Sequence, residues 1–268
     1  QEDYVPVLRD GIVQGIEQAA KNLAPARVGW IVADAREHTN CRRWVLRPDR
    51  VGTDPFGQRN IRAMMHPGYQ SPNHVAPSGP IDPDLTLLAV QSPDGRPIAV
   101  LANFSMHYFG APAVSSDYYG LFCAKLAKLL GAEKLQPAFV AVMSQGTAGD
   151  LHWMDYSQPK KNLGIQQYAE AVAKVAADAY RKIEYRDAAP IAMCEKKLTL
   201  GRRVPDEKRL AWAKGIIAKM QGPVPRSQQQ VYAQEAVYLH DEPTRELKLQ
   251  AIRVGDLGIT AIPCEVFG

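Results

Sequence analysis

PIAVLANFSMHYFGAPAVSSDYYGLFCAKLAKLLG, residues 97–131, and FVAVMSQGTAGDL, residues 139–151, decide the fold of this chain. Each stretch begins with a β-rich apolar run that leads directly into polar residues. Between the two runs, apolar residues from Tyr119 to Leu130 recur at the spacing of a helix with one buried face. The pattern predicts strand, helix, strand. Because such crossovers are right-handed, we expect the two polar segments to lie side by side beyond the carboxyl ends of the strands.

The residues after these strand ends are the first candidates for a functional site. His107 follows the first run, the loop Gly146–Asp150 follows the second, and Glu265 follows a late apolar strand. Zinc accepts imidazole and carboxylate ligands, so His107 and Glu265 are candidate metal ligands. A core histidine and a salt-bridged surface glutamate are the alternatives. Backbone N–H groups of the glycine loop suit an oxyanion, although a tight turn also explains the glycines.

The remaining pattern predicts an α/β protein, with a mixed β-sheet flanked by helices in a single domain over residues 1–268. Helices are expected at residues 6–23, 119–130, 164–183, 206–220 and 228–239, and strands at 28–33, 85–91, 97–102, 139–143, 192–200, 247–254 and 257–262. Turn signals at residues 92–95 and 255–256 predict two hairpins. We expect strands 28–33, 97–102, 139–143 and 257–262 to share one sheet.

A proline-rich segment from Arg47 to Pro83 interrupts this pattern. Its prolines exclude long helices and central strands, so we predict a long irregular loop across the polar end of the sheet. Loops of this length are uncommon in compact domains and are usually functional, disordered or inserted. His66 and His74 lie in it, and each is either a site residue or a solvated loop histidine.

Composition and motif searches exclude several classes of protein. With 268 residues, 46% of them hydrophobic and 22% charged, the chain has the composition of an ordinary globular protein. The net charge of +4 comes from dispersed basic residues, which argues against nucleic acid as a partner. We expect no transmembrane segment, because no apolar run approaches roughly 20 residues. The four cysteines are scattered without a CxxC pair, and GxxxxGK[ST], GxGxxG, GxSxG and HExxH are all absent.

Taken in order, the motifs resemble the neutral/alkaline (non-lysosomal) ceramidase family. The resemblance rests first on NFSMHYFG, VSSDYYG, FVAVMSQGTAGDL and the Pro-x-Glu of residues 263–265. It extends to the opening helix VLRDGIVQGIEQAAKNL, the turn HTNCRRW and the hairpin IDPDLTLLAVQSPDGRPIAVL. The similar segments occur in consistent order over most of the chain, which is more specific than any single motif.

The resemblance implies a zinc-dependent amide hydrolase. In that family two histidines, a glutamate and a tyrosine hold zinc, and His107 and Glu265 match one histidine and the glutamate. The other histidine would precede Gln1 and the tyrosine would follow Gly268, so the chain resembles the central part of a longer catalytic domain with an incomplete zinc site. The serine that the family uses falls on His152. A zinc-bound water can attack an amide without that serine, so Asp150 and His152 are the catalytic candidates.

The sequence therefore favours a ceramidase-like zinc hydrolase that cleaves an N-acyl bond in a small-molecule or lipid substrate. Substrate-binding candidates are the arginine-rich turn and the glycine loop, namely Asn40, Arg42, Arg43, Gly146, Thr147 and Gly149. The alternatives are a hydrolase acting on a glycan-derived or other N-acyl compound, and a binding module that keeps the fold without the chemistry. Export is suggested by the resemblance alone. The sequence does not indicate an oligomeric state.

Overall fold

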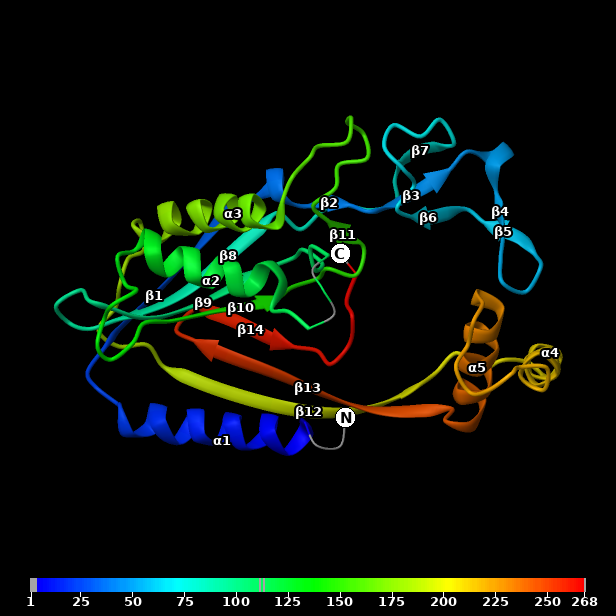
Figure 1. The fold of residues 1–268 in the computed structure, drawn as a ribbon. Coiled ribbons are helices and arrows are strands. Elements are labelled where there is room, and N and C mark those ends of the chain that lie inside the picture. Colours follow the sequence, from blue (N-terminus) through cyan, green and yellow to red (C-terminus); the bar gives the residue numbers. More distant parts are fainter. Residues whose placement is uncertain (1–3, 111, 113, 268) are drawn as a thin grey trace.

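A four-stranded mixed sheet forms the centre of the computed structural model, which describes residues 4–110, 112 and 114–267 (Figure 1). Its strands, in spatial order, are β1 (Arg27–Asp34), β8 (Asp84–Gln91), β9 (Pro97–Phe104) and β10 (Val140–Gln145). β8 is antiparallel to both of its neighbours, whereas β10 is parallel to β9. Helix α2 (Asp117–Leu129) connects β9 to β10, so the predicted strand–helix–strand unit is confirmed.

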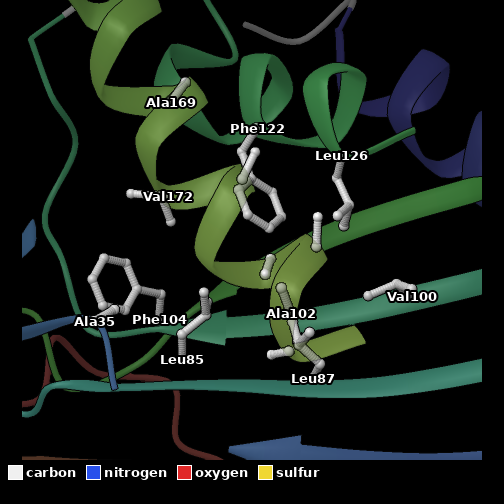
Figure 2. Packing of buried hydrophobic residues seen from close by; sticks show 14 of the residues in the cluster. Ala35, Leu85, Leu87, Val100, Ala102, Phe104, Phe122, Leu126, Ala169 and Val172 are labelled. Atoms are coloured by element: carbon white, nitrogen blue, oxygen red, sulfur yellow. The ribbon is translucent and has the colours of Figure 1, made fainter. Parts of the chain in front are cut away.

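Two helices cover one face of this main sheet. α2 and α3 (Ile165–Tyr180) pack on it, and the α/β class predicted from the sequence is confirmed. Alternate residues of β8 and β9 point toward the helices, as the pleat requires. Those with no more than 2% exposure are Leu85, Leu87, Ala89, Val100, Ala102 and Phe104. They meet Phe122, Leu126 and Val172 from the two helices, as Figure 2 shows, and this packing is the main core.

The late hairpin belongs to a second sheet. β12 (Ile191–Gly201), β13 (Thr244–Val254) and β14 (Leu257–Ala261) form an antiparallel sheet in that order. The prediction that residues 257–262 share a sheet with the other three strands is therefore wrong. The reason is that β13 offers its second edge to β14 through the Gly255–Asp256 turn, and apolar alternation specifies a buried face but not a pairing partner.

A helical hairpin extends from the far end of the second sheet. α4 (Glu207–Ile217) and α5 (Gln228–Asp241) lie between β12 and β13 in sequence and pack on a small core of Ala213, Ala233 and Ala236. Asp206 and Ser227 cap the two helices by accepting hydrogen bonds from the N–H groups of Arg209 and Gln230. In Figure 1 this hairpin stands apart from the main sheet.

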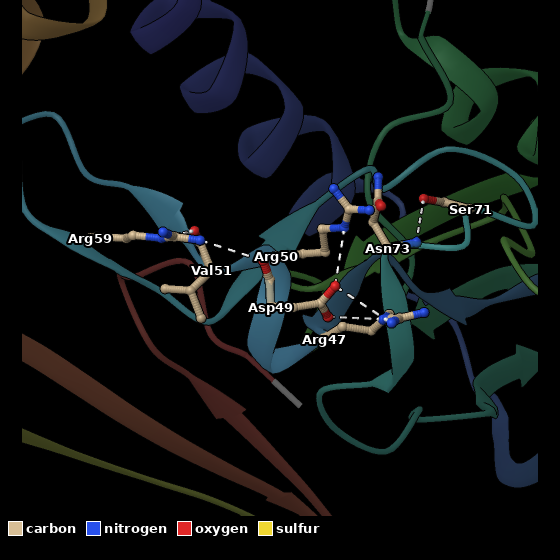
Figure 3. Close-up of polar contacts among 7 residues, drawn as sticks. All are labelled: Arg47, Asp49, Arg50, Val51, Arg59, Ser71 and Asn73. Carbon is tan, nitrogen blue, oxygen red and sulfur yellow. Dashed lines mark hydrogen bonds and ion pairs between the residues drawn. The ribbon is translucent and has the colours of Figure 1, made fainter.

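The prolyl segment, residues 47–83, contains no long helix or strand, but it is less irregular than predicted. It holds η2 (Pro48–Arg50), β4 (Gly52–Thr53), β5 (Arg59–Ile61), β6 (Ala63–Met65) and β7 (His74–Pro77), and β6 and β7 pair with β3 (Arg43–Leu46). Surface contacts such as Arg47 Nε to Asp49 Oδ1, 3.0 Å, and Arg59 Nε to the Val51 carbonyl, 3.2 Å, hold its base (Figure 3). Strands of two to four residues are too short to show the alternation of apolar and polar residues from which a strand is predicted.

The remaining elements are the first helix and a short bridge near the polar end of the main sheet. α1 (Tyr4–Lys21) has no buried residue. After η1 (Arg36–His38), strand β2 (Asn40–Cys41) pairs with β11 (Leu151–His152). None of the helices in the described part of the chain has the length and apolar character needed to cross a bilayer.

Candidate functional site

The end of β9 and the segment after β14 bring the two candidate metal ligands together. His107 Nε2 lies 3.4 Å from Glu265 Oε1, although the residues are far apart in sequence and follow strands of different sheets. The His107 side chain is mostly buried, whereas Glu265 is largely exposed. The two residues that the sequence offered as metal ligands therefore lie next to each other, although the strands that precede them belong to different sheets.

Arg42 forms the centre of the surrounding contacts. Its Nη2 donates to the Gly149 carbonyl at 2.7 Å and lies 3.7 Å from Glu265 Oε1, while its Nη1 lies 3.5 Å from His66 Nε2. Its backbone N–H donates to the Asp150 carbonyl at 2.7 Å. The Arg42 side chain is well buried, so its charge acts on its neighbours with little screening by solvent.

Three imidazole rings gather around Arg42. The ring centroids of His152 and His66 are 5.4 Å apart, and those of His152 and His107 are 6.3 Å apart. We call His66, His107, His152, Arg42 and Glu265 the imidazole cluster. His152 is 5% exposed, and its Nδ1 is buried without a hydrogen-bond partner among the described residues. The position that matches the serine of the resembled motif is therefore the innermost histidine of the cluster.

Burial keeps the imidazoles of the cluster neutral. Burial, together with the nearby His66, Arg42 and His107, lowers the pKa of His152 to about 3. Burial also lowers the pKa of His107, with the Arg42 charge adding to the effect and Glu265 opposing it. The pKa of His66 falls through burial and then through Arg42 and His107. Neutral imidazole is the form that binds metals and accepts protons.

Two further residues, His66 and Tyr156, belong to the site. His66 comes from the prolyl segment, and its Nδ1 lies 2.6 Å from the Tyr156 hydroxyl. Burial raises the pKa of Tyr156 to about 12, so the phenol keeps its proton. No motif marks either residue, and only the presence of His66 in a proline-rich loop hinted at a role. His74, the other histidine of that loop, bonds instead to Ser71 Oγ at 3.1 Å.

The glycine loop packs tightly against its neighbours. The N–H groups of Gly146, Thr147 and Gly149 donate to the Phe104 carbonyl, Ser105 Oγ and the Val266 carbonyl, at 3.0, 2.9 and 2.9 Å. A Cβ on Gly149 would lie 2.9 Å from the Phe267 ring, and one on Gly146 would overlap Ser105 Oγ. Close approach of neighbouring chain thus explains both glycines, and all three donors are engaged within the protein.

The other predicted residues lie at different distances from the cluster. Asp150 is buried and lies next to the cluster, because its carbonyl accepts a hydrogen bond from the backbone N–H of Arg42. Asn40 pairs with His152 across the β2–β11 bridge, and its Nδ2 donates to the Trp153 carbonyl at 3.3 Å. Arg43 begins β3 with an exposed side chain, and none of the contacts described for the cluster involves that side chain.

A cavity of about 340 Å³ lies between the two sheets, next to the glycine loop. Apolar side chains from the uncovered face of the main sheet and from β14 line most of it, among them Val32, Leu88, Leu101, Leu257 and Ile259. Its polar end holds Asp82, whose Oδ2 accepts a hydrogen bond from Ser105 Oγ at 2.5 Å. Its volume falls in the range typical of small-ligand pockets.

The fit of the site to zinc can be tested on the His107–Glu265 pair. Two ligands about 2.0–2.1 Å from a tetrahedral zinc lie roughly 3.3 Å apart, and the observed separation is 3.4 Å. The two donors therefore suit one ion. Among the described residues, however, no group of three or more histidine, cysteine, aspartate or glutamate side chains is arranged to hold a metal. The pair alone would supply only two of the ligands that a zinc ion needs.

Only the comparison with solved structures finds proteins similar to this chain. No family model and no curated protein sequence matches the chain. Among solved structures, the neutral ceramidase from Pseudomonas aeruginosa is similar, with a TM-score of 0.54 and 16% identity over 97% of this chain and 43% of that one. A ceramidase complexed with C2 gives a TM-score of 0.56 and 16% identity, over 97% of this chain and 45% of the other. The chain thus has a fold similar to that of neutral ceramidases and spans less than half of their length.

Proposed function

We propose that this chain forms part of a ceramidase-like, zinc-dependent hydrolase that cleaves an amide (N-acyl) bond. One observation carries the proposal: on a fold similar to that of neutral ceramidases, His107 Nε2 and Glu265 Oε1 converge to 3.4 Å. This is the separation expected of two ligands of one zinc ion. The remaining ligands would come from groups outside these 268 residues or from solvent.

The residues of the imidazole cluster other than His66, together with neighbouring residues, have roles in this proposal. His107 and Glu265 would hold zinc, which when bound supplies a Lewis acid and an activated water. Arg42, fixed by the Gly149 carbonyl, orients a polar or anionic part of the substrate. His152 is buried beside His107 and neutral, and a neutral imidazole can accept a proton. The Asp150 carbonyl accepts a hydrogen bond from the backbone N–H of Arg42 and so helps to position Arg42. Gly146, Thr147 and Gly149 shape the wall, with Asn40 fixing the His152 strand.

The substrate class follows from the surroundings of the site. The glycine loop borders both the imidazole cluster, through the Gly149 carbonyl, and the apolar cavity, which Gly146 and Thr147 help to line, so a substrate with an apolar chain next to its polar group suits the site best. A lipid N-acyl compound such as a sphingolipid has this character. A shorter N-acyl compound, including one derived from a glycan, is the second candidate, and the polar end of the cavity around Asp82 and Asn103 favours it.

Two substitutions test the proposal in the natural protein that carries this chain. His107→Ala and Glu265→Ala are each expected to abolish both bound zinc and hydrolysis of N-acyl amides while leaving the circular dichroism spectrum unchanged. Zinc is measured by atomic emission, and turnover by release of the free amine. His74→Ala, in the same prolyl segment as His66 but bonded to Ser71, is the matched control and should keep both properties. Residues 1–268 alone are expected to be metal-free or only partly occupied by zinc.

Full metal content in both alanine variants would reject the zinc proposal. If the wild type binds stoichiometric zinc but turns over no N-acyl probe, the zinc part of the proposal stands and the hydrolase part fails. In that case a non-catalytic binding module becomes the better description, and the presence of His152 where the resembled motif has a serine would be its main support.

A further inference from the structure

We infer that His66 is a positioning residue of the site, which holds the Arg42 guanidinium in place and keeps it from forming a close bidentate pair with the Glu265 carboxylate. The inference deepens the proposed function, because it concerns the same cluster. It rests on contacts that no family motif predicted: His66 belongs to the prolyl segment and reaches the cluster through Arg42 Nη1, 3.5 Å from its Nε2.

The backbone of His66 is the first observation. Its φ of 52° lies in the left-handed region, which few residues other than glycine adopt. A residue before proline is normally extended, and Pro67 follows His66 directly, so this conformation is unusual on two counts. The N–H of His66 donates to the Arg42 carbonyl at 2.9 Å, and this bond helps to hold the conformation. Strain of this kind persists only where the surroundings enforce it, and it gathers at functional sites.

Hydrogen-bond directions then determine what the imidazole does. Arg42 Nη1 can only donate, so His66 Nε2 must accept if the two interact favourably. A neutral ring with an accepting Nε2 carries its proton on Nδ1, which donates to the Tyr156 hydroxyl at 2.6 Å. Tyr156 in turn directs its own hydrogen to Met154 Sδ at 3.1 Å. Each step from Arg42 to Met154 thus has one donor and one acceptor, and the opposite tautomer would set two donors face to face.

As a consequence, both terminal nitrogens of the Arg42 guanidinium have hydrogen-bond acceptors. Nη2 is held by the Gly149 carbonyl at 2.7 Å and Nη1 by His66, while Glu265 Oε1 stays 3.7 Å from Nη2. Without His66, the guanidinium can turn toward Glu265 and form a close bidentate pair with it. Such a pair would compete for the carboxylate that His107 shares. His66 therefore keeps both the arginine and the carboxylate available to their own partners.

Two substitutions of His66 separate this role from a purely structural one. Gln places an amide oxygen near the position of Nε2 and keeps an acceptor for Arg42, whereas Asn reaches only the position of Nδ1. Asn, however, adopts positive φ more readily than Gln. A positioning role therefore predicts that His66→Gln performs better than His66→Asn. A role limited to the strained turn predicts the reverse order.

We would measure the Arg42 side chain directly, by ¹⁵N NMR of the guanidinium in the natural protein, together with zinc affinity and kcat and KM on a fluorogenic N-acyl amide. In His66→Asn the Arg42 guanidinium should rotate more freely, so its separate Nη signals are expected to average into one. The same variant should bind zinc more weakly, and its kcat should fall roughly tenfold with a smaller change in KM. His66→Gln should stay within about threefold of wild type. His74→Asn is the matched control, because His74 lies in the same segment and bonds only to Ser71 in the contacts described.

The outcomes are decisive in both directions. Arg42 signals that are the same in wild type and His66→Asn would overturn the inference, as would an Asn variant more active than the Gln variant. If the wild type hydrolyses no N-acyl probe, the proposed function fails. The NMR comparison then still decides whether His66 holds Arg42, since it needs neither substrate nor metal.

Discussion

α3 and α1 are both amphipathic helices of similar length, yet only one of them buries its apolar side. α3 buries seven residues against the main sheet and α2, whereas α1 buries none, and Ile12 and Ile16 on it are 55% and 65% exposed. β12 repeats the contrast, since all but one of its residues are exposed. Periodicity therefore identifies the side that a helix can bury. Whether that side is buried depends on elements distant in sequence. The main sheet and α2 supply such elements for α3, whereas no described element buries a residue of α1.

The largest effect is expected on the covered side. Phe104→Ala should lower the free energy of unfolding by about 3–5 kcal/mol, because Phe104 is fully buried between the sheet and the two helices. Val140→Ala, on the uncovered face of the same sheet, is the matched control and should cost less than about 1 kcal/mol. Urea denaturation of both variants measures the difference. Equal costs would mean that the two faces of the main sheet are not as different as the structure indicates.

The second effect tests whether the polar end of the main sheet is as buried as its core. The pKa of His152 is lowered to about 3 in the folded state, and an unfolded histidine titrates near 6.5. Below pH 6.5 the unfolded state therefore binds more protons, so stability is fully present above that pH and is lost progressively as the pH falls toward 3. For metal-free protein we expect a loss on the order of 3 kcal/mol between pH 7 and pH 4 beyond that of a His152→Gln variant.

Urea titrations at a series of pH values measure this loss. His66 and His107 also have a lowered pKa, so the Gln variant should keep a weaker dependence of the same sign. Parallel curves for wild type and His152→Gln would show that solvent reaches His152 in solution.

The third effect concerns Phe56, where the tip of the prolyl segment meets the helical hairpin of α4 and α5. Asp54 Oδ1 accepts hydrogen bonds from the N–H groups of Phe56 and Gln58, which fixes the turn at the tip of the prolyl segment. The Phe56 ring lies edge-on to Trp212 of α4, with centroids 5.0 Å apart, and the Arg209 guanidinium sits 3.7 Å from its centre. We expect Phe56→Ala to cost about 1–2 kcal/mol, from the loss of the aromatic and cation–π contacts.

Hydrogen–deuterium exchange shows where that cost falls. Exchange should rise in the tip of the prolyl segment and in α4 and α5, and should stay unchanged in α2 and α3. Phe56→Leu, which keeps the apolar volume but loses the ring, is expected to lie between wild type and Ala. Faster exchange throughout the main sheet would mean that the uncovered part stabilises the covered part, and would weaken the contrast drawn between them.

The sequence predicted elements better than partners. Every long helix and strand was expected close to its observed position, because capping residues, turn signals and periodicity are local properties. β14 was assigned to the wrong sheet, since its apolar residues report a buried face and say nothing of which edge it pairs with. The short strands of the prolyl segment were missed because two to four residues carry no readable alternation.

The residues of the site were likewise expected from the sequence only in part. His107 and Glu265 were singled out because each follows an apolar strand, whereas His152, the last residue of β11, was singled out because it matches the serine of the resembled motif. His66 and Tyr156 lie in connecting segments, where no rule relates sequence position to location in space. Their part in the site depends on the path of the prolyl segment, which is set by pairing of β6 and β7 with β3.

The smallest effect is expected on α1. Ile12→Ala removes apolar atoms that are already in contact with solvent, and alanine is the better helix former, so the free energy of unfolding should change by less than about 0.5 kcal/mol. Urea denaturation at two protein concentrations, tenfold apart, checks this. A cost of 2 kcal/mol or more that grows with concentration would show that α1 is covered in solution by a second copy of the chain. A similar cost that is independent of concentration would show that α1 packs within its own chain, and the contrast with α3 would then fail, because both helices would be covered.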